Sequence, residues 1–253
     1  MPPLLDFTDK VVLITGAATG MGRATALKFG AQGARVVVGD RDARGAETVQ
    51  LIEEAGGTGL FVEADVTEED SVAALVDAAT DTYGRLDAAW NNAGVLPATK
   101  PLAEMTLDDW HRTIAVDLTG VFLSLKYEIA YMAEHGGGSI INTASVAGVI
   151  ADPGMAPYVA AKHGVIGLTR AAAVDYARQG IRVNAVAPGL VNTPLTQRWL
   201  DDPEMRETVV AGSQMRRAAD PSEIAGIVLY LASDLATFAT GGVFTVDGGQ
   251  TAH

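Results

Sequence analysis

The chain has 253 residues, of which 48% are hydrophobic and 19% charged, so a large buried core is possible and global disorder is excluded. Its 31 acidic and 18 basic residues give a net charge of −13, which argues against partners such as nucleic acid or an anionic membrane. The absence of cysteine excludes disulfides and thiol chemistry. No signal peptide is visible and no apolar run approaches the ~18 residues of a membrane span, so we expect a soluble, cytoplasmic protein.

Short β-rich runs alternate with amphipathic stretches along the whole chain, without a linker-like tract or an internal repeat. Thr67–Asp70 and Asp220–Glu223 each place a capping residue and acidic residues at the start of a helix. This alternation predicts one α/β domain over residues 1–253, a Rossmann-type doubly wound parallel sheet of about seven strands with helices on both faces. The predicted strands are Val11–Thr15, Arg35–Gly39, Gly59–Ala64, Leu86–Trp90, Ser139–Thr143, Arg182–Ala187 and Val243–Val246.

The first predicted strand runs directly into a glycine-rich turn, Thr15–Gly22, and we expect a helix from about Arg23. Glycines let backbone approach a pyrophosphate, and the N-terminus of the helix supplies free N–H groups to the phosphates. The spacing Gly-x-x-x-Gly-x-Gly differs from the more common G-x-G-x-x-G, and no Gly-Lys-Ser/Thr follows, so the turn is not a P-loop. Taken alone, the motif is also compatible with an ordinary glycine-rich turn between a strand and a helix.

The second predicted strand leads to Asp40, eighteen positions after Gly22, where an acid that binds the adenosine ribose belongs. A carboxylate there accepts hydrogen bonds from both ribose hydroxyls and repels a 2′-phosphate, so we predict NAD rather than NADP. Arg41 complicates this prediction, because an arginine near this point can bind the 2′-phosphate. No basic residue at positions 17 to 19 offers a second phosphate contact.

Three residues indicate the chemistry of an alcohol–ketone oxidoreductase. Tyr158 and Lys162 are four positions apart in a helix-compatible stretch, so both project from one face, and Ser145 follows the fifth predicted strand at the carboxyl edge of the sheet. A secondary alcohol loses its hydroxyl proton as hydride leaves for nicotinamide. A nearby ammonium and the positive nicotinamide ring would together lower the pKa of a tyrosine toward that of a usable base. A serine hydroxyl holds the substrate oxygen in line. Tyr-x-x-x-Lys by itself is equally compatible with a surface pair on a helix.

Together these features resemble the short-chain dehydrogenase/reductase family in its common single-domain branch. The resemblance covers the whole chain and depends on six segments in the order and spacing of the family. They are the turn at Thr15–Gly22, Asp65-Val66, Asn91–Gly94, Ser145 thirteen positions before Tyr158, Tyr158–Lys162, and Asn184–Gly189.

The resemblance implies where the cofactor lies. Asp65 and Val66 are expected to face the adenine, and Lys162 to bind the nicotinamide ribose as well as to tune Tyr158. The ribose side is expected at Asn92, Ala93 and Gly94, and the nicotinamide beside Pro188, Gly189, Val191 and Thr193. With the turn, the expected contacts are Gly16, Thr19, Gly20, Met21, Gly22, Asp40, Arg41, Asp65, Val66, Asn92, Ala93, Gly94, Tyr158, Lys162, Pro188, Gly189, Val191 and Thr193.

One position departs from the family pattern. Asp117 stands where the family usually has an asparagine as a fourth catalytic residue, which helps to hold a water that links the lysine to solvent. Aspartate keeps the backbone carbonyl and the approximate shape but loses the amide donor. We therefore expect an active enzyme whose proton relay through Asp117 is perturbed.

The expected function is hydride transfer between NAD(H) and a secondary alcohol or ketone. The loops after the strands offer mainly apolar side chains, which favours a mainly apolar and cyclic or aromatic substrate, and we expect no metal. We also expect a homo-oligomer, a tetramer by the resemblance, with an interface on a long helical stretch from about Leu107 to His135. A 3-ketoacyl-thioester reductase and a cofactor-binding regulator without turnover are the rival interpretations. Residues predicted to line the substrate pocket are Leu96, Val149, Met155, Leu195, Trp199, Leu200 and Met205.

Overall fold

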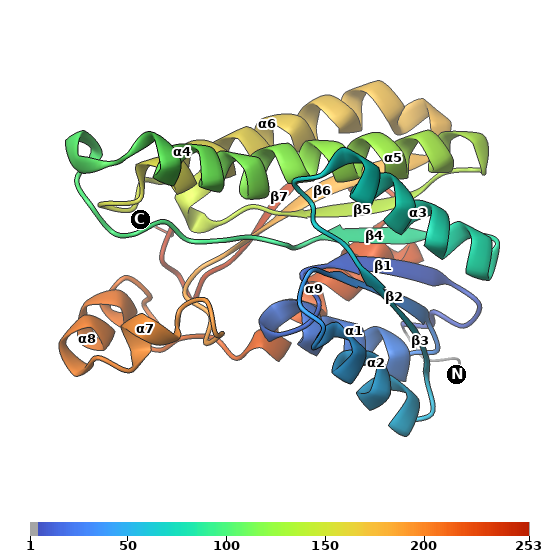
Figure 1. The fold of residues 1–253 in the computed structure, drawn as a ribbon, viewed down its shortest axis with the longest axis horizontal. Coiled ribbons are helices and arrows are strands. Elements are labelled where there is room, and N and C mark those ends of the chain that lie inside the picture. The colour runs from blue at the N-terminus through green and yellow to red at the C-terminus, as the bar shows by residue number, and fades with distance from the viewer. Residues whose placement is uncertain (1–4, 253) are drawn as a thin grey trace.

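The computed structural model describes residues 5–252. Seven parallel strands form one sheet in the order β3-β2-β1-β4-β5-β6-β7 (Figure 1). All seven predicted strands are present, each end within two residues of its predicted position. Their bounds are β1 Val11–Thr15, β2 Arg35–Asp40, β3 Thr58–Glu63, β4 Ala88–Asn91, β5 Gly138–Thr143, β6 Ile181–Pro188 and β7 Val243–Val246.

Helices cover both faces of the sheet, with α3, α5 and α6 on one side and α1, α2 and α9 on the other (Figure 1). Successive side chains of a strand point to opposite faces. Leu13 of β1 therefore packs in the core under α3, α5 and α6, and its neighbour Ile14 packs in the core under α1, α2 and α9. The helix bounds are α1 Gly20–Ala31, α2 Gly45–Glu54, α3 Glu69–Tyr83, α4 Leu107–Ile114, α5 Gly120–Glu134, α6 Ala156–Tyr176, α7 Gln197–Leu200, α8 Pro203–Ala211 and α9 Pro221–Ala232. The predicted doubly wound fold class is confirmed.

The strand order reverses between β1 and β4, because β2 and β3 extend the sheet to one side and β4 to β7 extend it to the other. Loops that follow β1 and β4 at this point leave the sheet in opposite directions, which opens a crevice at the carboxyl edge. The short helices α7 and α8 project beyond the same end of the sheet (Figure 1).

Two predicted helix starts are wrong and one is confirmed. Helix α1 begins at Gly20, three residues before Arg23, so its first turn belongs to the glycine motif. Thr67 does not cap α3, since its hydroxyl donates to Asp65 Oδ1 and the helix begins only at Glu69. At α9, by contrast, Asp220 and Glu223 form a reciprocal capping box, as the sequence predicts.

The long helix expected from Leu107 to His135 is interrupted. Helix α4 ends at Ile114, a π-helical turn runs over Ala115–Thr119, and α5 begins at Gly120. Such turns widen the helix by one residue and often occur at functional sites. This one places the side chain of Asp117 inside the protein, with none of its surface exposed.

None of the helices within residues 5–252 has the length and apolar composition that a membrane crossing requires.

Candidate active site

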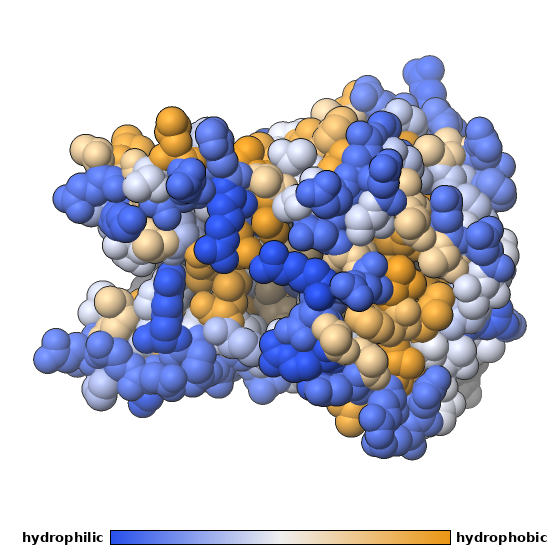
Figure 2. Space-filling view, viewed as in Figure 1, coloured by the Kyte–Doolittle hydropathy of each residue, from blue (hydrophilic) through white to orange (hydrophobic). Residues whose placement is uncertain are grey.

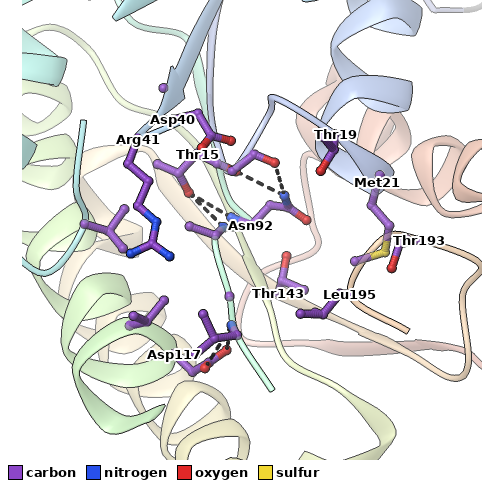
Figure 3. A pocket seen from close by; sticks show the side chains of 18 of the residues that line it. Thr15, Thr19, Met21, Asp40, Arg41, Asn92, Asp117, Thr143, Thr193 and Leu195 are labelled. Carbon is purple, nitrogen blue, oxygen red and sulfur yellow. Dashed lines mark hydrogen bonds between the residues drawn. The ribbon is translucent and has the colours of Figure 1, made fainter. Parts of the chain in front are cut away.

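The crevice at the carboxyl edge contains a pocket of about 240 Å³, which we call the cofactor pocket. It extends from the end of β2 past the glycine turn to the π-helical turn and α6. Figure 3 shows Asp40 and Arg41 at one end of it and Asp117 at the other. Among the predicted cofactor contacts, those that line it are Gly16, Thr19, Gly20, Met21, Asp40, Arg41, Asp65, Val66, Asn92, Ala93, Gly94, Tyr158, Lys162 and Thr193.

The glycine turn depends on close backbone contacts that exclude side chains. Gly16 has a φ of +66°, and a Cβ there would lie 2.7 Å from the Cα of Ala93. Gly22 is buried below the turn, where a Cβ would lie 2.2 Å from the carbonyl oxygen of Gly16. The side-chain amide of Asn92 donates to the carbonyls of Thr15 and Gly16, both at 3.1 Å (Figure 3). Gly22 therefore shapes the turn from beneath rather than lining the pocket.

Within the described residues, no side chain caps the N-terminus of α1. Its first N–H groups and its positive dipole end are therefore directed at the pocket, which suits a diphosphate. Two more polar atoms of residues that line the pocket, Asn92 Oδ1 and Thr143 Oγ1, are buried without a partner in the described part of the chain. Acceptors of this kind match ribose hydroxyls, so the residues present fit a nicotinamide dinucleotide.

Asp40 is fixed at the end of β2 by two backbone donors. Its Oδ2 accepts a hydrogen bond from the N–H of Ala18 at 2.8 Å, and its Oδ1 accepts one from Asp42 at 2.9 Å. The first of these bonds ties the carboxylate to the glycine turn itself. Arg41 also lines the pocket and makes no ion pair within residues 5–252.

A second cavity of about 410 Å³, the substrate cavity, adjoins the cofactor pocket. Figure 2 shows the molecule hollowed on this side, with hydrophobic residues inside the hollow. Tyr158 and Thr193 line both spaces, whereas Ser145 lines the substrate cavity alone. Three residues expected beside the nicotinamide also lie in the wall of the substrate cavity, namely Pro188, Gly189 and Val191.

Five of the seven predicted pocket residues line the substrate cavity: Leu96, Met155, Leu195, Trp199 and Met205. The prediction is wrong for Val149, which is 45% exposed outside the cavity, and for Leu200, which is packed in the interior at 8% exposure. Sequence reasoning missed Asp152 and Gln250, which also line the cavity. Gln250 follows β7 and reaches the cavity only because the chain folds back toward it. Asp152 lies between Ser145 and Tyr158 in the sequence, and that position is a signal that could have identified it.

Ser145, Tyr158 and Lys162 are brought together at the junction of the two spaces. Ser145 follows β5, and its Oγ accepts a hydrogen bond from the N–H of Ala147 at 3.1 Å, which fixes the hydroxyl. Tyr158 lies in the first turn of α6, and the Nζ of Lys162, one turn later, lies 5.3 Å from the centre of its ring. Both side chains thus project from one face of α6 toward the end of β5.

The ammonium group of Lys162 is held by two groups at the inner end of the site. It donates to the carbonyl oxygen of Thr143 at 2.9 Å and lies 3.1 Å from the Oδ1 of Asp117. The Asp117 carboxylate also accepts hydrogen bonds from the N–H of Val95. A Cβ at Gly94 would lie 2.8 Å from Asp117 Oδ1, so this segment must pass the carboxylate without a side chain.

The charges of the site act on Tyr158 in opposite directions. Burial raises the pKa of Tyr158 above its ordinary value, and the negative charges of Asp117 and Asp152 add to the rise. Lys162 and a hydrogen bond from Ser145 lower this pKa but do not outweigh burial. The predicted lowering influence of Lys162 on this pKa is present. Burial also raises the pKa of Asp117, against the attraction of Lys162.

Comparison with known proteins identifies the family. The family model described as enoyl-(acyl carrier protein) reductase matches residues 16–251. The chain belongs to the short-chain dehydrogenase/reductase family. It is therefore an oxidoreductase, as the sequence predicts.

Similar proteins align over almost their whole length. The chain is 45% identical to cis-4-hydroxycyclohexanecarboxylate dehydrogenase of Sinomonas cyclohexanicum, over 97% of this chain and 98% of that protein. It is 43% identical to cyclohexanol dehydrogenase of Acinetobacter sp., over 97% and 96% respectively. The crystal structure of levodione reductase superimposes with a TM-score of 0.94 at 39% identity, over 97% of this chain and 99% of the other.

Proposed function

We propose that this dehydrogenase/reductase transfers hydride between NAD(H) and a secondary alcohol or ketone on a six-membered ring. The observation that carries the proposal is the meeting of two spaces at Tyr158: a pocket that fits a dinucleotide and a mainly apolar cavity that contains Ser145. Only at such a junction can a side chain exchange a proton with a substrate whose carbon faces a nicotinamide.

We assign the proton transfer to Tyr158. In oxidation, the Tyr158 phenolate takes the hydroxyl proton as the carbon–hydrogen electron pair leaves the substrate. A nicotinamide held in the cofactor pocket would supply the acceptor for that hydride. Ser145 donates to the substrate oxygen and holds it within reach of the phenol. Lys162 supplies positive charge beside the ring, and its contacts with Thr143 and Asp117 hold it there. The proton then leaves Tyr158 through a relay in which Lys162 releases one of its own protons toward solvent as it takes up another, and we propose that Asp117 positions Lys162 for this relay.

The preference for NAD is supported by the position of Asp40. Its carboxylate lines the pocket and is bonded to the glycine turn, so a 2′-phosphate placed on the adenosine ribose would meet a fixed negative charge. Arg41, unpaired within residues 5–252, is the feature that favours NADP as the second candidate. The fixed carboxylate of Asp40 favours NAD. To bind a 2′-phosphate, Arg41 must offset the repulsion between that phosphate and Asp40, and also the conformational entropy that its own side chain loses.

A cyclic substrate is supported by the shape and lining of the cavity and by the relatives. About 410 Å³ of space lined by Leu96, Met155, Trp199 and Met205 accommodates an apolar ring. Two relatives are named for reactions on cyclohexane rings that carry a hydroxyl group. We extend this substrate class to the present chain.

The rivals are less well supported. A 3-ketoacyl-thioester reductase must accept a carrier with anionic phosphate groups, and the residues that line the substrate cavity within the described chain include no lysine, arginine or histidine. A regulator without turnover has no need for a buried Lys162 beside Tyr158 at the point where the two spaces meet.

Measurement of NAD or NADP reduction with a panel of cyclic and open-chain secondary alcohols tests the proposal. We expect turnover with NAD and cyclic alcohols, and weaker turnover with NADP. Equal or better use of NADP contradicts the cofactor assignment. If no alcohol is turned over with either cofactor while cofactor binding is intact, the result favours a cofactor-binding regulator.

We also propose a homo-oligomer, with a tetramer expected for the family. Exposed apolar side chains on the outside of the helices support this assembly, among them Leu107, Phe122 and Val174. The mass of the protein in solution is the measurement that checks it. The cytoplasmic location stays a prediction from the sequence.

A further inference from the structure

The substrate cavity contains one carboxylate that the mechanism does not use. Asp152 follows Ser145 and precedes Tyr158 in the sequence, and it lines the substrate cavity. The rest of the cavity wall consists of apolar and uncharged polar side chains. Among the described residues that line this space, it is the one with a formal charge, Tyr158 being a neutral phenol at its ordinary pKa.

The loop that carries Asp152 is held by hydrogen bonds on both sides of that residue. The N–H of Ile150 donates to Val146 at 2.8 Å, and the N–H of Lys100 donates to the carbonyl of Gly154 at 3.1 Å. Ala151 and Pro153, on either side of Asp152, are exposed, whereas Asp152 itself is half-buried. The backbone therefore turns Asp152 inward while its neighbours face solvent.

Asp152 has no hydrogen-bond or ion-pair partner in the described part of the chain. No hydrogen bond or ion pair within residues 5–252 involves its carboxylate, although burial raises its pKa above the ordinary value. Its charge also acts on Tyr158, which places the carboxylate within electrostatic reach of the reacting hydroxyl. A half-buried carboxylate left without a donor is costly, because its lost hydration is not replaced. The cavity thus offers a bound molecule an unused hydrogen-bond acceptor.

We propose that Asp152 selects substrates that carry a second hydroxyl group on the ring, a cyclic diol or hydroxyketone, by accepting a hydrogen bond from that group. This inference rests on the proposed function and specifies its substrate class. The reacting hydroxyl meets Ser145 and Tyr158, and the apolar wall covers the ring. The second hydroxyl donates to Asp152 and supplies the partner that the protein does not.

The same charge decides which ring compounds are disfavoured. A ring carboxylate brought into the cavity meets Asp152 with no basic residue among the described lining residues to offset the repulsion. A simple monohydric ring leaves Asp152 desolvated and unpaired. Selection against both follows from one side chain. It is separable from catalysis because any effect of Asp152 on Tyr158 is common to all substrates, whereas the hydrogen bond is made only by the second hydroxyl group.

The test compares kcat/KM for three kinds of substrate with NAD in the wild type and in Asp152→Ala. The substrates are the positional and cis/trans isomers of cyclohexanediol, the best monohydric cyclic alcohol, and cis-4-hydroxycyclohexanecarboxylate. We expect the wild type to favour at least one diol. Asp152→Ala should lower kcat/KM for that diol by roughly tenfold to a hundredfold, the usual value of a hydrogen bond to a charged group. The monohydric alcohol and the ring carboxylate should both improve, because neither then faces an unpaired Asp152.

Two further variants make the result decisive. Asp152→Asn keeps an acceptor oxygen but removes the charge, so it should recover part of the diol activity and still admit the carboxylate. Asp175→Asn removes an exposed carboxylate at the far end of α6 and controls for the change in net charge. The inference is overturned if no diol has a higher kcat/KM than the monohydric alcohol in the wild type. It is also overturned if Asp152→Ala changes kcat/KM for all substrates by the same factor. Neither result affects the proposed hydride transfer with cyclic alcohols, which is contradicted instead if no cyclic alcohol reduces the cofactor.

Discussion

Lys162 and Asp117 form an ion pair in the interior of the active site, with Nζ and Oδ1 3.1 Å apart. Their side chains are 2% and 0% exposed, so the pair is shielded from solvent. Lys162 comes from α6 and Asp117 from the π-helical turn between α4 and α5. The charge that favours the Tyr158 phenolate is thus partly offset by a carboxylate in the position where the family usually has a neutral amide.

Replacing Asp117 with asparagine should therefore keep or raise turnover and move the pH dependence. Asp117 raises the pKa of Tyr158, so its removal lowers that pKa. Alcohol oxidation requires the deprotonated phenol, and its rate rises as the pH passes this pKa. The rise should move to lower pH in Asp117→Asn, as measured by oxidation rate against pH.

Asp117→Leu leaves Lys162 buried without its partner, which typically costs about 3–5 kcal/mol. This variant should lower turnover with little change in NAD affinity. A fully active leucine variant would exclude Asp117 from the relay.

Tyr158→Phe should nearly abolish oxidation and leave cofactor binding intact. The ring and its packing remain, but the group that exchanges the substrate proton is gone. Loss of general acid–base help alone lowers rates by ~10²–10⁴. Turnover and NAD affinity, measured separately, check this expectation. If the variant retains turnover within about tenfold of wild type, the assigned chemistry is wrong.

Lys162→Met should weaken NAD binding and move the oxidation profile in the direction opposite to Asp117→Asn. The Lys162 charge lowers the pKa of Tyr158, so its loss raises that pKa and shifts the residual activity to higher pH. The ribose contact proposed for Lys162 is also lost. Lys162→Arg keeps the charge on a broader group and should recover only part of either effect. A methionine variant with an unchanged pH profile would show that Lys162 does not set the protonation of Tyr158.

Asp40→Ser should relax the preference for NAD. The substitution removes the fixed charge at the end of β2, and with it the repulsion of a 2′-phosphate, while Arg41 remains in the pocket. The ratio of kcat/KM for NAD to that for NADP should fall, measured with one alcohol substrate. Arg41→Ala in the same background separates the two side chains, because it should weaken NADP alone. An unchanged ratio in Asp40→Ser would remove the basis for the cofactor assignment.

Glu128 should make the folded protein less stable as the pH rises from 4.5 to about 7. It is fully buried on α5; its Oε2 accepts a hydrogen bond from Asn91 at 3.0 Å, and its Oε1 has no partner within residues 5–252. Burial raises the pKa of Glu128 from 4.5 to about 7. Below 4.5 the carboxyl is protonated in both states and the shift has no effect. Between 4.5 and 7 only the unfolded chain ionises, which lowers the free energy of unfolding by about 3 kcal/mol in total.

Glu128→Gln should remove this dependence. The difference in the free energy of unfolding between variant and wild type, from denaturant titrations, should rise in favour of the variant across this pH window and stay constant above it. Glu134→Gln removes an exposed carboxylate from the same helix and controls for the lost charge. Parallel curves for wild type and Glu128→Gln would contradict the buried, protonated state.

The sequence by itself determined the fold class and the order of the elements. Parallel strands buried on both faces must be continuously apolar. A run such as Val36–Val38 can therefore be recognised as a strand from its own residues, without knowledge of the neighbouring strands. Turns that need glycine, and helices that carry Tyr158 and Lys162 one turn apart, are likewise local features. The candidate residues Ser145, Tyr158, Lys162 and Asp40 could all be named from their spacing, because each lies at a fixed distance from a strand end or a helix start.

What only the tertiary structure decided are the contacts between elements and their electrostatic consequences. The sequence placed Asp117 in the site, but its pairing with Lys162 depends on a π-helical turn, which no local pattern of residues specifies. Burial, a property of the packed protein, raises the pKa of Tyr158 against the influence of Lys162. Asp152 looks like an ordinary loop residue until its neighbours are seen to face solvent. Desolvation and Coulomb interactions depend on distances through space, and the fold alone sets those distances.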